Sequence, residues 1–389
     1  MDNIINPFSP NAGSRPPELA GREDIFRDVR VFLGRLPTGR SVQSLLFTGL
    51  RGVGKTVLLN EIVHMAERQG NVLPIYLEAS EARSLGAMLA SPLRLALLKL
   101  DRMKGTGAKV RSGLSVLRNF LGTIKVSFGG VGFELEPATG RADSGDLQFD
   151  LTELLVAVAE AAAERQMGVV LLIDEIQYVT EPEFGALVMA LHRIQQLGLP
   201  LAMAGAGLPT LPGLAGEAKS YAERLFTYPV IGALSKEASV LAIRRPFLDA
   251  GVEVEDSAAD TVYRRSGGYP YFIQEWGYQL WNFVEGGPVT ATDAEMVDEI
   301  VSRQLDGNFF RVRMERLTPS EKSFLRAMSQ IGGERIRMAD ISRNLGISVN
   351  ALGPRRSSLV KRGMIYSPSH GLVAFTVPLF DEFLRRNPV

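Results

Sequence analysis

Residues 49–56 read Gly49-Leu50-Arg51-Gly52-Val53-Gly54-Lys55-Thr56. The stretch fits the pattern G-x-x-x-x-G-K-[ST], in which a glycine-rich loop wraps around phosphate with its backbone N–H groups pointing inward. A lysine at this position reaches the β- and γ-phosphates of a nucleotide, and the threonine hydroxyl holds Mg²⁺. We therefore expect this loop, together with the adjoining Val57, to bind a nucleotide.

The residues on either side of the loop suit this role. Residues 43–48 form a short, mostly apolar segment of the kind that becomes a buried strand. After the loop, apolar residues recur at helical spacing, at Leu58, Leu59, Ile62, Val63 and Ala66. The loop is thus predicted to join a strand to a helix, whose N-terminus adds its positive dipole end to phosphate binding. This context is typical of P-loop nucleotide triphosphatases.

A second stretch, residues 169–175, is an apolar strand that ends in Asp174 and Glu175. A strand that is apolar on both faces is typical of a parallel sheet, and such sheets bind ligands at the carboxyl ends of their strands. Asp174 is predicted to orient Mg²⁺ and its waters, and Glu175 to polarise the attacking water as general base. The alternative is that the two carboxylates only open a solvated loop.

Strands and helices alternate from residue 41 to about residue 226. The pattern predicts strands at 43–48, 72–77, 168–173 and 201–204, and helices at 18–36, 55–68, 84–104, 150–166 and 182–197. Such alternation is typical of an α/β fold with a parallel sheet covered by helices. Residues 105–149 interrupt it, and the alternating pattern around Gly129-Gly130 predicts a hairpin in this insertion. Residues 235–306 are predicted to be helical, like a lid.

A third pattern begins at residue 317. Thr318 as N-cap, Pro319 at the first helical position and Glu321 closing a capping box predict a helix that runs to about residue 330. Further helices are expected at 338–345 and 348–362, and Pro354 should kink the latter or mark its true start. A β-ribbon with a turn at 368–371 follows. Three helices and a ribbon predict a winged helix-turn-helix.

Charge is unevenly distributed along the chain. The whole sequence has zero net charge, but residues 317–389 hold 11 Lys and Arg against 5 Asp and Glu, a net charge of +6. The third helix of this segment carries Arg355, Arg356, Lys361 and Arg362. In a winged helix this helix enters the major groove, where arginines contact phosphate or guanine edges. We expect duplex DNA as the partner; the alternative is a protein-docking module whose basic residues are solvated.

Other residue types exclude several chemistries. The sequence has no cysteine, which excludes disulfides, thiol catalysis and Cys-based zinc sites and suits a reducing cytosol, so a cytoplasmic protein is expected. No apolar run approaches the length needed to span a bilayer, and no membrane partner is expected. The histidines His64, His192 and His370 lack metal-ligand spacing, and His192 is a weak candidate for a site contact.

With these residues in hand, the chain resembles the AAA+/STAND branch of P-loop ATPases. Within it, the chain is most similar to the archaeal-ATPase and origin-recognition-like proteins and to bacterial ATP-binding proteins of that group. The resemblance rests on the box Gly21-Arg22-Glu23, the phosphate loop and Asp174-Glu175, and it covers nearly all of the chain. It implies ATP and Mg²⁺ as cofactors. We expect a P-loop ATPase core at 1–230, a helical lid at 231–310 and a winged helix domain at 311–389.

The resemblance also implies further site residues. The stretch Gly268-Tyr269-Pro270 matches the Gly-x-Pro motif of STAND-type members, so Tyr269 and Pro270 would meet the base or ribose, and Arg22 would also bind the cofactor. Arg224 lies where an arginine could stabilise transition-state charge, in its own chain or on a neighbouring subunit of a homo-oligomer. A surface or Glu223-paired arginine is the alternative.

One feature departs from the family pattern. Many such ATPases place a polar γ-phosphate sensor at the end of the strand over 201–204, where this chain has Gly205 and Ala206. Slow hydrolysis is therefore expected. The leading hypothesis is an ATP-hydrolysing molecular switch that couples nucleotide state to a DNA-binding winged helix. The alternatives are a STAND-type signalling ATPase whose winged helix contacts protein, and a nucleotide-binding protein with negligible turnover.

Overall fold

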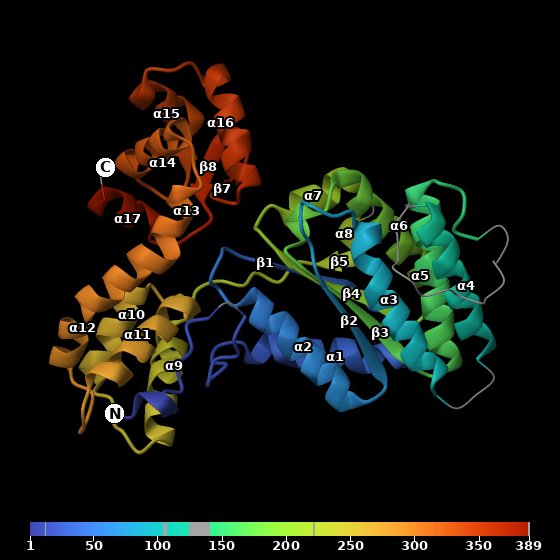
Figure 1. Cartoon of the computed structure of the whole chain (residues 1–389), viewed down its shortest axis with the longest axis horizontal. Coiled ribbons are helices and arrows are strands. Elements are labelled where there is room, and N and C mark those ends of the chain that lie inside the picture. Colours follow the sequence, from blue (N-terminus) through green and yellow to red (C-terminus); the bar gives the residue numbers. More distant parts are fainter. Residues whose placement is uncertain (12, 104–106, 124–140, 221, 388–389) are drawn as a thin grey trace. The chain divides into compact units, whose positions relative to one another are not determined.

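In the computed structural model, the phosphate loop joins β1 (Ser44–Thr48) to α2 (Lys55–Gln69), as expected from the sequence. The structure describes residues 1–11, 13–103, 107–123, 141–220 and 222–387 (Figure 1). They divide into two units: unit 1 is Met1–Glu23, Gly49–Val57 and Ile231–Val389, and unit 2 is Asp24–Thr48 and Leu58–Val230. The phosphate loop therefore belongs to the same unit as the C-terminal half of the chain.

Unit 2 is built on a parallel sheet. Besides β1, its strands are β2 (Val72–Glu78), β3 (Gly168–Asp174), β4 (Leu201–Gly207) and β5 (Phe226–Thr227). The strand order is β2-β3-β4-β1-β5, and each of the strand pairs is parallel. The predicted α/β fold with a parallel sheet is confirmed. Since all strands run the same way, the ends of β1, β3 and β4 lie along one edge.

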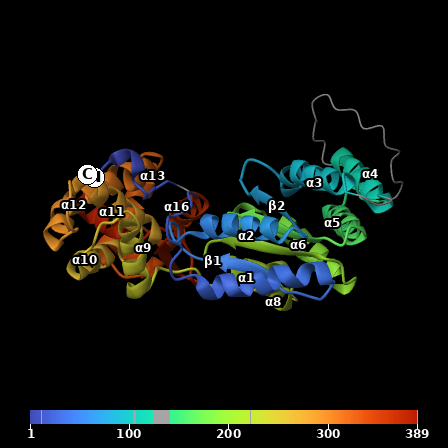
Figure 2. The same cartoon turned by 90° about the horizontal axis from the view of Figure 1, so that it is seen from below.

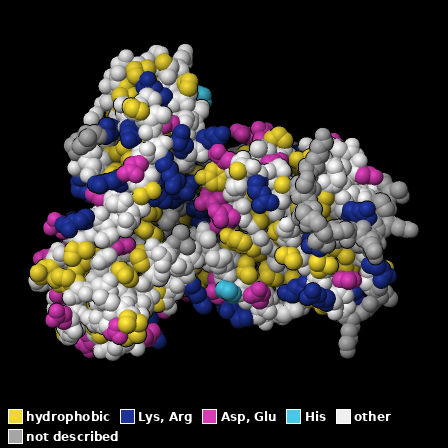
Figure 3. Space-filling model, in the orientation of Figure 1, with side chains coloured by type: hydrophobic (Ala, Val, Ile, Leu, Met, Phe, Trp, Pro, Cys, Tyr) yellow, Lys and Arg dark blue, Asp and Glu magenta, His cyan; other side chains and the backbone are white. Residues whose placement is uncertain are grey.

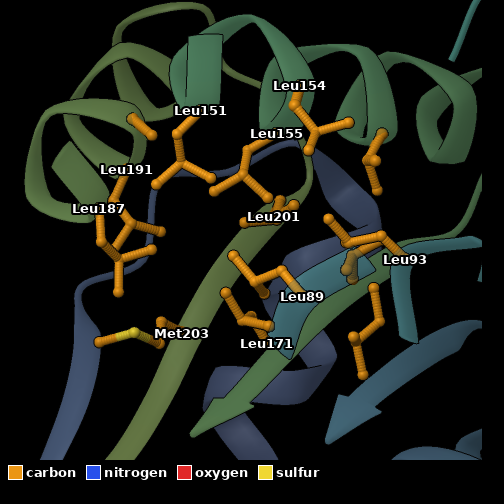
Figure 4. Close-up of a cluster of buried hydrophobic side chains, with 14 of the residues drawn as sticks. Leu89, Leu93, Leu151, Leu154, Leu155, Leu171, Leu187, Leu191, Leu201 and Met203 are labelled. Carbon is orange, nitrogen blue, oxygen red and sulfur yellow. The ribbon is translucent and has the colours of Figure 1, made fainter. Parts of the chain in front are cut away.

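Helices cover both faces of this sheet. Their bounds are α1 (Glu23–Arg35), α3 (Leu85–Asp101), α4 (Ala108–Thr123), α5 (Leu147–Glu164), α6 (Glu181–Gln196), α7 (Leu211–Ala218) and α8 (Ala222–Leu225). The side chains of α3, α5 and α6 meet those of β3 and β4 in a leucine-rich core (Figure 4). On the opposite face Leu45 and Phe47 share a groove with Val29 and Phe32 of α1. Successive side chains of β1 point to opposite faces of the sheet, so they pack in two separate apolar layers.

The insertion differs from its prediction in part. The hairpin predicted over residues 123–135 lies almost entirely outside the described residues. Helix α4 was not predicted, although Val110, Leu114, Leu117 and Leu121 recur at helical spacing and are buried. It packs on α3 and α5 (Figure 2). The insertion therefore adds a helix to the layer of α3 and α5.

After residue 231, unit 1 is first a run of helices, the segment predicted to be a lid and called the lid below. Its helices are α9 (Lys236–Asp249), α10 (Asp256–Ser266), α11 (Pro270–Phe283) and α12 (Ala291–Gln304), followed by a π-helical segment, Leu305–Arg311, and the short α13 (Val312–Glu315). The predicted helical pattern over 235–306 is confirmed. Within the described ranges, no helix combines the length and hydropathy needed to cross a membrane.

The chain ends in a module of helices and a small sheet. Its elements are α14 (Pro319–Ile331), β6 (Ile336–Arg337), α15 (Met338–Leu345), α16 (Val349–Lys361), β7 (Ile365–Tyr366), β8 (Leu372–Phe375) and α17 (Phe380–Arg386). The antiparallel strands are ordered β6-β8-β7. Helix α16 begins at Val349 with Ser348 as N-cap, so Pro354 lies inside it and does not mark its start. Stacked rings of Phe310 and Phe383 join this module to the end of the lid.

Helix α14 begins with the predicted capping box. Thr318 N–H donates to Glu321 Oε2 over 2.8 Å, and Glu321 N–H donates to Thr318 Oγ1 over 3.3 Å. The same carboxylate is only 3% exposed and accepts a hydrogen bond from Ser358 of α16. Burial alone would raise the pKa of Glu321, but the hydrogen bonds from Ser358 and Thr318 and the charge of Arg362 outweigh it, so the pKa is lowered. One carboxylate thus caps α14 and ties it to α16.

We predict that Glu321→Gln destabilises the chain at pH 7 and flattens its acid dependence. A carboxylate whose folded pKa is lowered contributes stability above its unfolded pKa of about 4.3, and this contribution is lost as the pH falls through the folded value. Glutamine can still close the capping box, so the loss should be about 1–2 kcal/mol from the charge-assisted bonds. Chemical unfolding at pH 7 and pH 4 measures it, and equal destabilisation at both pH values would contradict the assignment.

Candidate nucleotide site

The backbone of the loop takes a shape that other residues could hardly adopt. Gly54 has φ +91°, in the region that favours glycine. Gly49 leaves no room for a side chain, since a Cβ there would lie 2.2 Å from the carbonyl oxygen of Ile231. Both glycines of the motif pattern are thus required by geometry. The loop leads directly into the N-terminus of α2, which favours an anion.

Lys55 lies inside this loop. Its side chain is buried, with 8% exposed, and its Nζ donates to the carbonyl oxygens of Gly49, over 2.8 Å, and Leu50, over 2.7 Å. A buried ammonium requires such partners, because burying an uncompensated charge is costly. Phosphate oxygens would be stronger partners for it than neutral carbonyls. The loop and its lysine therefore fit a nucleotide phosphate.

The lid reaches the loop through the predicted Gly-x-Pro motif. Gly268 has φ +72° and its carbonyl accepts from Leu234 N–H over 2.8 Å. This turn places Tyr269 as the N-cap and Pro270 as the first residue of α11. The next residue, Tyr271, donates its N–H to the carbonyl of Gly52 over 3.3 Å. The motif is thus brought to the loop, whereas its contact with base or ribose stays a prediction.

Arg22 also contacts the loop. Its Nη2 donates to the carbonyl of Val53 over 3.3 Å and to that of Gly232 over 2.5 Å. Burial lowers the pKa of Arg22, against the opposing charge of Glu23. The predicted site residue therefore ties the loop to the segment that enters the lid.

The C-terminal module reaches the loop as well, which the sequence did not indicate. Arg51 N–H donates to the carbonyl of Thr376 over 3.0 Å. Thr376 is fully buried, and its hydroxyl donates to the carbonyl of Gly363 over 2.5 Å. Nearby, burial and the charge of Arg51 lower the pKa of Arg313 to about 10. The negative charge of phosphate bound at the loop would offset the repulsion between Arg51 and Arg313.

Unit 2 contains the second motif. Asp174 is the last residue of β3 and is 2% exposed, and its Oδ1 accepts from Glu175 N–H over 2.8 Å. Its Oδ2 lies 3.5 Å from the hydroxyl of Tyr76, whose pKa is raised by burial and then by the charge of Asp174. Carboxylate oxygens such as those of Asp174 are ligands that Mg²⁺ prefers.

The backbone of Glu175 takes a left-handed conformation with φ +50°. This costs energy for a residue with a side chain and is found most often where function demands a particular orientation. Asp174 and Glu175 lie at the same edge of the sheet as Thr48, the residue before the loop. The predicted metal ligands, Thr56 and Asp174, belong to different units, and their joint role stays a prediction.

The remaining candidates lie elsewhere. Arg224 lies in the last turn of α8, shortly before β5, and its carbonyl accepts from the side chain of Gln43 over 2.9 Å. Gln43 precedes β1, so Arg224 lies at the amino ends of the strands, opposite the edge where β1 ends. A catalytic role for Arg224 would thus require a neighbouring subunit. His192 lies 3.5 Å from Gln196. Among the described residues, no group of three or more His, Cys, Asp or Glu could hold a metal.

Two parts of the chain match models of protein families. Residues 18–203 match the family model described as AAA ATPase domain, and residues 307–384 match a domain of unknown function (DUF8462). No curated protein sequence matches the chain. The structure is similar to that of the Aeropyrum pernix ORC2 protein in ADPNP–ADP complexes, with a TM-score of 0.55 and 15% identity over 97% of this chain and 96% of that one.

A Walker-type ATPase of Pyrococcus abyssi is also similar, with a TM-score of 0.52 and 18% identity over 95% of this chain and 97% of the other. At such identities the likeness concerns the fold. Residues 18–203 thus match an AAA ATPase domain, and the fold around them is similar to that of P-loop ATPases. Within that class the chain resembles the archaeal-ATPase and origin-recognition-like family, as its sequence predicted.

We predict that Lys55→Ala and Glu175→Gln separate binding from turnover. Lys55→Ala removes the buried ammonium and should weaken ATP binding by about 100-fold or more. Glu175→Gln should bind ATP as the natural chain does and hydrolyse it poorly, trapping the bound nucleotide. Calorimetry and phosphate release measure the two effects, with Lys99→Ala and Glu181→Gln as matched controls. Natural turnover in Glu175→Gln would show that the assigned base is wrong.

Proposed function

We propose that the chain is an ATP- and Mg²⁺-dependent switch whose nucleotide state controls the C-terminal module, and that this module is a winged helix. Lys55 would hold the β- and γ-phosphates, and Thr56 and Asp174 would hold Mg²⁺, which neutralises charge on the phosphates. Glu175 would orient and deprotonate the attacking water. The ADPNP–ADP complexes of the similar Aeropyrum pernix protein support nucleotide binding by this fold. The proposed domains are core 1–230, lid 231–310 and winged helix 311–389.

One observation carries the proposed coupling: a single peptide unit links Lys55 to the module. The carbonyl of Leu50 accepts from Lys55 Nζ over 2.7 Å, and the N–H of the same peptide bond, that of Arg51, donates to Thr376 over 3.0 Å. The two groups of a trans peptide are rigidly coplanar and point in opposite directions. If Lys55 turns to a phosphate, this plane loses one of its anchors and can rotate against Thr376.

Coupling of this kind has a thermodynamic condition. ATP can shift the module only if it binds more tightly to one arrangement of loop and module than to the other. A coupling free energy of about 1–3 kcal/mol, or roughly a 5- to 150-fold change in affinity, is usual for such linked sites. The loss or gain of one hydrogen bond between Arg51 and Thr376 is of this order.

For the output, we propose duplex DNA bound by the module. Figure 3 shows Lys and Arg side chains on its surface. Two of the four predicted contact residues also hold the module together: Arg356 donates to Ser367 over 2.6 Å, and Arg362 donates to the carbonyl of Arg316 over 3.0 Å. We assign the DNA contact to Arg355 and the exposed Lys361 of α16, together with the exposed Arg335 and Arg337 at β6.

We predict that duplex DNA binds with a steep salt dependence that ATP alters. Titrations at several salt concentrations should give a slope of about −0.9 per neutralised phosphate. The double change Arg355→Ala with Lys361→Ala should reduce that slope by about 2, whereas Arg27→Ala with Arg303→Ala, exposed cations elsewhere, should leave it unchanged. Affinity should differ at least about fivefold between ATP-loaded Glu175→Gln and Lys55→Ala.

A flat or absent response to DNA in every nucleotide state would exclude DNA as the output. The STAND-type alternative, in which the module binds another protein, would then be the preferred function of the module. ATP-dependent change in hydrodynamic size without DNA binding would support that alternative.

A further inference from the structure

The end of β4 lacks a polar side chain of its own, yet a polar group lies there. Gln177, in the short turn Ile176–Tyr178 that follows Glu175, accepts at its Oε1 from the N–H of Leu208 over 3.2 Å. Gly207 is the last residue of β4, and a Cβ there would lie only 2.5 Å from the same Oε1. The glycine thus leaves the space that the glutamine amide occupies.

The other end of the same amide contacts the predicted base. Gln177 Nε2 donates to Glu175 Oε2. A glutamine amide has one accepting and one donating end, so two partners of opposite type fix its orientation. Leu208 supplies the donor and Glu175 the acceptor. The amide therefore connects the end of β4 to the carboxylate that follows β3.

We propose that Gln177 is a positioning residue that fixes the plane of the Glu175 carboxylate for attack by water. The inference rests on the proposed function, in which Glu175 is the general base. Many ATPases that the chain resembles place a polar sensor on the strand end itself. Here the stretch Gly205-Ala206-Gly207 has none, and the amide comes from the segment after β3. A catalytic carboxylate needs a defined orientation, and hydrogen bonds from neighbouring side chains supply it.

The test uses two variants. One removes the amide of Gln177, and the other fills the space beside Gly207 that the amide occupies. Gln177→Leu keeps the size and removes both hydrogen bonds; kcat for ATP hydrolysis should fall roughly 10- to 100-fold, with KM changed less than about threefold. Gly207→Ala should act in the same direction, because its methyl group displaces Oε1. The double variant should be little worse than either single one, since both remove the same contact.

Gly205→Ala is the matched control on the same strand. A Cβ at Gly205 would meet Leu46 at 2.8 Å and not Gln177, so it causes a comparable steric conflict without touching the amide. With the folded fraction determined by thermal unfolding, kcat per folded molecule should stay at the natural value in Gly205→Ala. A rise in KM alone, or an increase in kcat, in Gln177→Leu would overturn the positioning role.

A second measurement does not depend on turnover. In chain labelled with ¹⁵N at glutamine side chains, the Gln177 amide signal is identified by its loss in Gln177→Leu. It should shift in Glu175→Ala and in Gly207→Ala, and an unshifted signal in Glu175→Ala would overturn the contact. Natural kcat in Gln177→Leu with lost turnover in Glu175→Gln would refute this inference alone, whereas natural turnover in Glu175→Gln would refute the proposed base.

Discussion

The peptide bond between Leu50 and Arg51 constrains the phosphate loop from both sides. Its carbonyl is bonded to the ammonium of Lys55, and its N–H is bonded to the carbonyl of Thr376 in the C-terminal module. Because the peptide bond is planar, its carbonyl cannot rotate unless its N–H rotates as well. The group that would contact ATP and the segment proposed to respond to it are therefore separated by a single rigid unit.

The sheet of unit 2 supplies the proposed chemistry. Strand β3 ends with Asp174 at the carboxyl edge of the sheet. Glu175 follows in a left-handed backbone conformation, and its side chain accepts a hydrogen bond from Gln177. Gly207, at the end of β4, makes room for that amide. In the proposed function, hydrolysis depends on side chains at and after the end of β3 and on the space left by Gly207. The switch depends on the phosphate loop.

Local patterns predicted much of this structure. The phosphate loop, the Asp174-Glu175 strand end and the capping box at Thr318 depend on residues close together in sequence, and each was found where expected. Helix α4 could have been predicted from its buried leucines. The contact of Arg51 with Thr376 joins segments far apart in the chain, so no periodicity indicates it. The internal bonds of Arg356 and Arg362 likewise depend on tertiary packing.

Hydrogen exchange of the Arg51 amide, with and without ATP·Mg²⁺, tests the central claim most directly. This amide is the donor to Thr376, so its protection reports the link itself. ATP should change exchange at Arg51 and in residues 363–376 of the natural chain and leave both unchanged in Lys55→Ala, which lacks the ammonium proposed to bind phosphate. Unchanged exchange at Arg51 and at 363–376 in natural chain saturated with ATP would contradict the account.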